Sequence, residues 1–136
     1  MTHEHATPRV RRLGQVVLAL LLAAAPALHA HHSAAMFDFQ KTLTLSGTVT
    51  RFEYVNPHSW LYVNVRNEDG TVTEWGFELD APPRLRRIGV SPNHWQAGDA
   101  VTVKTNPLRD GRPAGLLVGA AGESGKTFGN TEGLTP

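Results

Sequence analysis

The chain has 136 residues, with 13 Lys and Arg against 12 Asp and Glu and no cysteine. This length suits one small domain with extensions, because domains usually contain about 100 to 150 residues. The balanced charge disfavours nucleic-acid binding, which needs a basic face, and the lack of cysteine excludes disulfides and thiolate metal sites.

Residues 1–30 have the pattern of a secretory signal peptide. Arginines within residues 9–12 precede an apolar run at 16–25, and small residues suited to cleavage follow. The run is shorter than the roughly 20 residues of a spanning helix, which disfavours an uncleaved anchor. No second hydrophobic segment follows, so we expect no membrane span after cleavage. Cleavage after Ala30 leaves His31 as the N-terminal residue, and cleavage after Ala27 is the competing site. The expected location is periplasmic or secreted.

The remaining sequence reads mainly as β-strands. Five strands are predicted, at residues 41–53, 60–67, 71–79, 100–105 and 116–121. Within the first, apolar residues change parity after Val49, which predicts a bulge or sharp bend. Asp69-Gly70 is a strong hairpin signal between the second and third strands. A long, bent first strand is what a small closed barrel requires.

Two shorter features complete the domain. Pro82 and Pro83 suit the first turn of a short helix between the third and fourth strands, which Gly89 ends. Trp95 is predicted to plug the core, and Phe37 is predicted to anchor an N-terminal arm formed by residues 31–38.

These elements predict a mainly β fold, a small five-stranded OB-like Greek-key barrel with one short helix between strands 3 and 4. A small β-sandwich is the alternative. The predicted domain spans residues 31–121 with its arm, and residues 122–136 are expected to form a disordered tail because apolar residues are sparse there. The core is predicted to contain Leu43, Leu45, Val49, Val63, Val65, Phe77, Val101 and Val103.

A polar segment between the first two strands is the best place to look for function. Asn56-Pro57 imposes a turn and stiffens the backbone that leads into His58. With Ser59 and Trp60, these residues form the predicted binding loop. In OB barrels, ligands meet the face of strands 2 and 3 and the loops joining strands 1 to 2 and 4 to 5. The second of these loops is expected at residues 106–114.

Several segments together resemble a known family. They are His31-His32-Ser33 after the leader, Gly47-Thr48-Val49, Val55-Asn56-Pro57-His58-Ser59-Trp60, and Gly98-Asp99 before a Val-rich strand. The combination is similar to an uncharacterised family of secreted bacterial proteins, the domain of unknown function numbered 6152. The resemblance covers residues 31 to about 121. It implies the domain boundaries and the small barrel, and it brings no activity.

Copper binding is the sharpest functional hypothesis. An N-terminal His31 offers its free amine and its imidazole Nδ1 to one ion, and His58 would complete a tetragonal nitrogen site of the kind that Cu(II) prefers. This arrangement is a histidine brace. His32 is a further candidate ligand through its ring, and Met36 is a soft candidate ligand for Cu(I).

The alternative is a non-enzymatic periplasmic module that binds a peptide or a sugar without metal. Its groove would be lined by Tyr54, Trp60, Tyr62 and Trp75. Outward rings of Trp60 and Tyr62 would favour this interpretation, and inward rings would disfavour it. No spacing of acidic residues and no motif indicates an enzyme, so catalytic residues are not predicted. The expected partners are a metal ion and, as a second class, another periplasmic protein.

Overall fold

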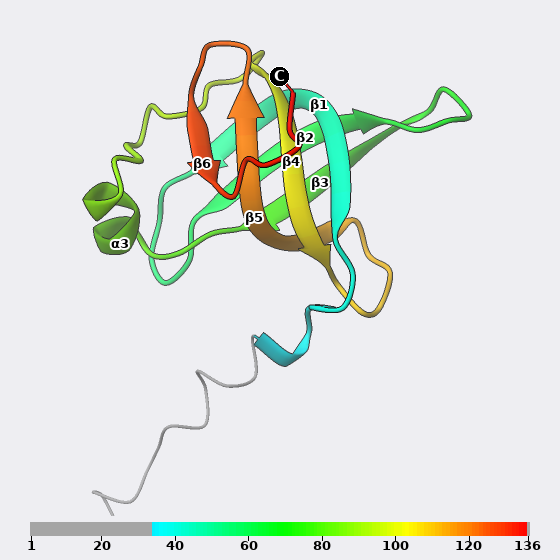
Figure 1. Ribbon diagram of the computed structural model, residues 1–136, viewed down its shortest axis with the longest axis horizontal. Coiled ribbons are helices and arrows are strands. Elements are labelled where there is room, and N and C mark those ends of the chain that lie inside the picture. The colour runs from blue at the N-terminus through cyan, green and yellow to red at the C-terminus, as the bar shows by residue number, and fades with distance from the viewer. Residues whose placement is uncertain (1–33, 136) are drawn as a thin grey trace, which may run out of the picture. The chain divides into compact units, whose positions relative to one another are not determined.

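The computed structural model describes residues 34–135, which form a mainly β fold (Figure 1). The elements are β1 (Leu43–Glu53), β2 (Trp60–Arg66), β3 (Val72–Glu78), α3 (Pro82–Arg87), β4 (Ala100–Pro107), β5 (Ala114–Gly122) and β6 (Thr127–Gly129). Among these residues, no helix is both long enough and apolar enough to cross a membrane.

Five strands close into a barrel. The sheet order is β3-β2-β1-β4-β5-β6, and β3 also pairs with β5 in parallel, Gly76 opposite Ala114 and Glu78 opposite Leu116. All the other strand pairs are antiparallel. The predicted five-stranded barrel with one short helix between the third and fourth strands is therefore confirmed.

Strand β1 serves two sides of the barrel, as its change of parity predicts. Its first part pairs with β4 and its second part with β2, and the register shifts between Val49 and Arg51. Gly47 lies where β1 pairs with both neighbours. A Cβ atom there would lie 2.2 Å from the carbonyl oxygen of Asn64, so only glycine allows this close approach.

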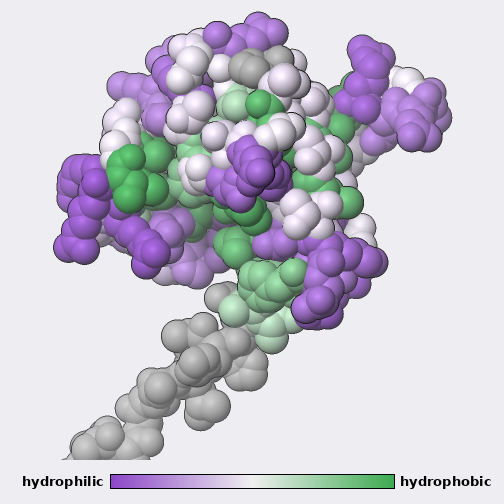
Figure 2. Space-filling view, in the orientation of Figure 1, coloured by the Kyte–Doolittle hydropathy of each residue, from purple (hydrophilic) through white to green (hydrophobic). Residues whose placement is uncertain are grey.

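The core fills the barrel and extends beneath α3. Leu85 of α3 is fully buried, and Trp95 is 3% exposed and packs edge-to-face against Phe52 with ring centroids 5.1 Å apart. Trp95 therefore plugs the core as predicted. Six of the eight predicted core residues are buried, but Leu43 and Leu45 are only half-buried. Hydrophilic residues gather over α3 and over the β2–β3 hairpin (Figure 2).

The structure differs from the sequence analysis in the C-terminal segment, where a disordered tail was expected. Strand β6 pairs with residues 119–121 of β5, and the half-buried Phe128 packs against the core. Glycine makes this docking possible, because a Cβ at Gly119 would lie 1.8 Å from the carbonyl oxygen of Asn130. Backbone pairing and one aromatic side chain thus order a segment that has few apolar residues.

Candidate functional site

The loop between β1 and β2 is tied down on both sides of His58. Before it, the Tyr54 hydroxyl donates to the carbonyl oxygens of Pro82 and Val90, at 2.9 and 3.1 Å. After it, Ser59 is fully buried, and its carbonyl oxygen accepts a hydrogen bond from the Leu79 amide at 2.8 Å. These anchors fix the backbone that carries His58.

His58 is paired with Glu78. Its Nδ1 lies within hydrogen-bond distance of the Glu78 carboxylate, and the side chains of His58 and Glu78 are 41% and 8% exposed. The pairing follows from the hairpin register, which places Glu78 of β3 opposite Trp60 of β2. A neutral His58 that donates its Nδ1 hydrogen to Glu78 keeps the lone pair of Nε2 for another partner.

Burial dominates the ionisation of Glu78. Removal from water disfavours the charged carboxylate and raises the pKa of Glu78, while the charge and the hydrogen bond of His58 act in the opposite direction. His58 is therefore the neighbour that stabilises the charged form of the Glu78 carboxylate in this buried position. Losing His58 would leave a buried acid without that support.

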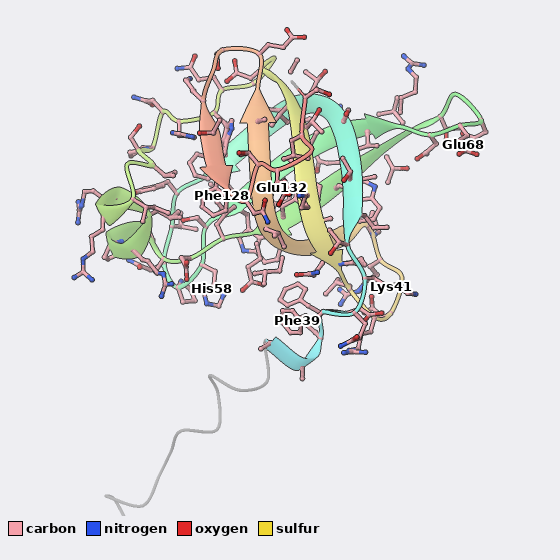
Figure 3. All side chains as sticks on the ribbon, viewed as in Figure 1. Phe39, Lys41, His58, Glu68, Phe128 and Glu132 are labelled. Carbon is pink, nitrogen blue, oxygen red and sulfur yellow. The ribbon has the colours of Figure 1, made fainter. Side chains whose placement is uncertain are left out.

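The N-terminal arm is bound to the β4–β5 loop by its backbone. The Asp38 amide donates to the Pro107 carbonyl at 2.8 Å, and the Arg109 amide donates to the Met36 carbonyl at 2.9 Å. Phe37 forms a bridge with Leu108 and is 2% exposed, so it anchors the arm as predicted. The labelled Phe39, which follows the arm, and His58 both lie at the lower end of the barrel in Figure 3.

Only part of the predicted metal site lies in the described residues. His31 and His32 are outside them, and Met36 is exposed, with its carbonyl oxygen accepting a hydrogen bond from the Arg109 amide. Residues 34–135 contain no group of three or more His, Asp or Glu side chains suited to hold a metal ion. The described portion of the candidate site is therefore the His58–Glu78 pair.

The outer face of the barrel carries a stack of aromatic rings. Trp60 and Tyr62 point outward from β2, with ring centroids 6.2 Å apart and planes at 25°. The rings lie close to Gly76 of β3, where a Cβ would be 3.2 Å from the ring of Tyr62. The outward placement is the outcome that favours the binding-module hypothesis.

A ladder of charges borders this stack, and the sequence analysis missed it. The Arg51 guanidinium lies 3.4 Å from the centre of the Tyr62 ring, and its Nη1 donates to both carboxylate oxygens of Glu74 at 2.9 and 3.0 Å. Arg51 also contacts Glu53 through Nε at 3.0 Å. Hydrogen bonding to Arg51 lowers the pKa of Glu74. Outward parity on β1 and β3 was the signal that could have found this ladder.

The other predicted binding residues fall into separate environments. Asn56 and Pro57 are exposed at the loop, whereas the buried Ser59 joins two backbone segments and presents no contact surface. Trp75 points inward and stacks against Phe77, with ring centroids 6.1 Å apart. The predicted groove of four aromatic residues is therefore divided between the inner and outer faces of the barrel.

Comparison with family models shows to which family the chain belongs. A family model described as a family of unknown function (DUF6152) matches residues 18–118. The chain belongs to this family. The match agrees with the resemblance carried by the double histidine and the Asn-Pro-His segment. Searches of curated proteins and of solved structures find no match.

Proposed function

We propose that this DUF6152 protein is a periplasmic or secreted copper-binding protein, in which His58 and an N-terminal His31 are ligands. The observation that carries the proposal is the His58–Glu78 pair. Histidines that bind metals commonly donate their second ring nitrogen to a carboxylate, which fixes the ring and raises the basicity of the ligating nitrogen. Glu78 fits that role for His58.

The donors fit copper better than a harder cation. An amine and two imidazoles form a nitrogen set, which suits Cu(II), whereas Mg²⁺ and Ca²⁺ prefer oxygen ligands. In this proposal, His31 supplies its amine and ring, His58 supplies Nε2, and His32 or Met36 is auxiliary.

The deciding experiment is copper titration by calorimetry of protein that begins at His31. Protein with one extra N-terminal Gly keeps every side chain but blocks the amine position. His58→Ala removes the proposed imidazole ligand, and Glu78→Gln removes the carboxylate that orients it. The two ligand changes should each abolish tight 1:1 binding, and Glu78→Gln should weaken it by about 10- to 100-fold.

His94→Ala is the matched control. The ring of His94 is held by the Thr127 carbonyl at 3.2 Å and is partly buried, so it is a histidine of the same domain with a structural contact. Its removal should leave copper affinity unchanged. Equal affinity in the protein that begins at His31, its Gly-extended form and His58→Ala would refute the brace, and a loss only in His58→Ala would indicate a site made of side chains alone.

A second candidate is the metal-free binding module for a peptide or a sugar, and the outward Trp60–Tyr62 stack is the observation that favours it. Flat aromatic surfaces bordered by hydrogen-bonding side chains suit sugar rings. Titration with chitotetraose in the presence of EDTA, followed by tryptophan fluorescence, tests this function. Binding that Trp60→Ala abolishes supports the module, and no saturable change contradicts it.

A further inference from the structure

The mouth of the barrel contains a cavity that the proposed copper site does not use. It has a volume of about 270 Å³ and lies between the arm, the start of β1, β3 and the β4–β5 loop. Its floor and walls are apolar, formed by Trp75, Leu43 and Leu108, and its rim carries Lys41, Arg109 and Arg112. Mouths of β-barrels are common positions for small-molecule sites.

Trp75 is an inward-facing aromatic residue that the core does not enclose. It lies on the same side of β3 as the fully buried Phe77, and their rings stack with planes 12° apart. Trp75 itself stays only half-buried and lines the cavity. A planar ring in the cavity would cover indole surface that the protein leaves open and would continue the stack.

The rim of the cavity is positively charged. Asp38 lies 3.9 Å from Lys41 Nζ and 3.7 Å from Arg109 Nη1, and Asp110 lies 2.8 Å from Arg112 Nε. Three cations against two carboxylates leave a net positive charge. The cationic side chains are 57 to 71% exposed, so an anion in the cavity can approach them from the solvent side. The labelled Lys41 marks this rim in Figure 3.

The rim is built by hydrogen bonds rather than by loose loops. The Leu108 amide donates to the Ala114 carbonyl at 2.9 Å, which closes the base of the β4–β5 loop. The arm is hydrogen-bonded to the end of β4 and to the same loop, as described above for Asp38 and Met36. Asp110 accepts a hydrogen bond from the Arg112 amide at 3.1 Å, which shapes the loop tip. A preformed cavity lowers the entropy cost of binding.

We propose that this cavity binds a small planar carboxylate, whose ring packs against Trp75 and whose carboxylate meets Arg112, Arg109 and Lys41. Arginine presents a planar fork of donors that matches a carboxylate. The volume corresponds to about nine water molecules at roughly 30 Å³ each, which is enough for a single ring with its carboxylate.

Titration of the purified protein with benzoate tests the proposal, with EDTA present and ionic strength held constant. In two-dimensional ¹H–¹⁵N NMR spectra, benzoate should cause saturable shifts at the Trp75 indole N–H and at the amides of residues 108–112. Benzamide has the same shape without the charge, and it should bind about tenfold more weakly, since a charged hydrogen bond contributes more than a neutral one.

Three variants make the result decisive. Arg112→Gln changes a mostly exposed side chain, so the fold should persist, and benzoate affinity should fall several-fold. Trp75→Leu should weaken benzoate and benzamide alike. Arg86→Gln, an exposed arginine of α3, is the matched control and should change nothing. Equal binding of benzoate and benzamide, equal binding by Arg112→Gln, or shifts that do not saturate or lie outside the cavity would each overturn the proposal.

Discussion

Replacing Phe128 by Ala tests whether the C-terminal segment is part of the folded domain. Removing a fully buried Phe side chain costs about 3 to 5 kcal/mol, including the cavity that remains. Phe128 is half-buried, and its ring meets Trp95 edge-to-face with centroids 6.2 Å apart. About half of the full cost, roughly 2 kcal/mol, is therefore expected for Phe128→Ala.

For a domain of about 60 to 100 residues, each kcal/mol shifts the melting temperature by about 4 to 8 °C. Phe128→Ala should therefore lower the melting temperature by roughly 8 to 16 °C, measured by circular dichroism and checked by urea unfolding. Leu134→Ala is the matched control, because Leu134 is half-buried but lies outside the core cluster. It should have a much smaller effect. Equal melting temperatures for Phe128→Ala and the unmodified protein would show that the segment does not stabilise the barrel.

Four further predictions concern the candidate site and its surroundings. His58→Ala should raise the pKa of Glu78, because the charge and hydrogen bond of His58 lower it, and ¹³C NMR of the carboxyl carbon measures the change. Since the folded state holds the Glu78 proton more tightly than the unfolded state, its contribution to stability falls as pH rises from about 4.5 through the folded-state pKa. Urea unfolding measures the free energy of unfolding of Glu78→Gln and of the unmodified protein at each pH. The value for Glu78→Gln should rise relative to that of the unmodified protein between pH 4 and pH 7, and a constant difference would contradict this linkage. A double-mutant cycle of Arg51→Ala and Glu74→Ala should give a coupling free energy of about 0.5 kcal/mol, because both side chains are exposed. This coupling should become smaller in high salt. A coupling above about 2 kcal/mol would argue against a solvated pair. Copper affinity should drop steeply below about pH 6, because the amine and imidazole of His31 must be deprotonated to bind. Calorimetry at a series of pH values measures this drop. An affinity that does not change with pH would indicate a site without imidazole ligands.

Sequence patterns among neighbouring residues predicted most elements of the barrel. The change of parity after Val49 predicted the bulge in β1, and Asp69-Gly70 predicted the β2–β3 hairpin, because both depend on neighbouring residues. The Pro82 start of the helix and its Gly89 stop are also local. By contrast, the parallel β3–β5 pairing that closes the barrel joins residues far apart in sequence and has no local signal.

The partner of His58 was within reach of sequence reasoning but was not found. The hairpin turn fixes the β2–β3 register, and that register places Glu78 beside Trp60 and therefore near His58. The burial of Glu78 could not be predicted, because it depends on how the barrel closes. The segment after Gly122 was misjudged for a related reason, since its order comes from backbone pairing with β5 and not from its own composition.

The way β5 is paired has a consequence for the protein in crowded surroundings. Its first residues pair with β3, but β3 ends at Glu78, and residues 119–121 are paired instead with β6. The β5 segment Leu116-Leu117-Val118-Gly119-Ala120-Ala121 has no charge and no proline, which makes it a template for adding strands from other chains. Strand β6 occupies the hydrogen-bonding groups of residues 119–121. We therefore expect loss of the short C-terminal strand to expose this segment and to promote aggregation.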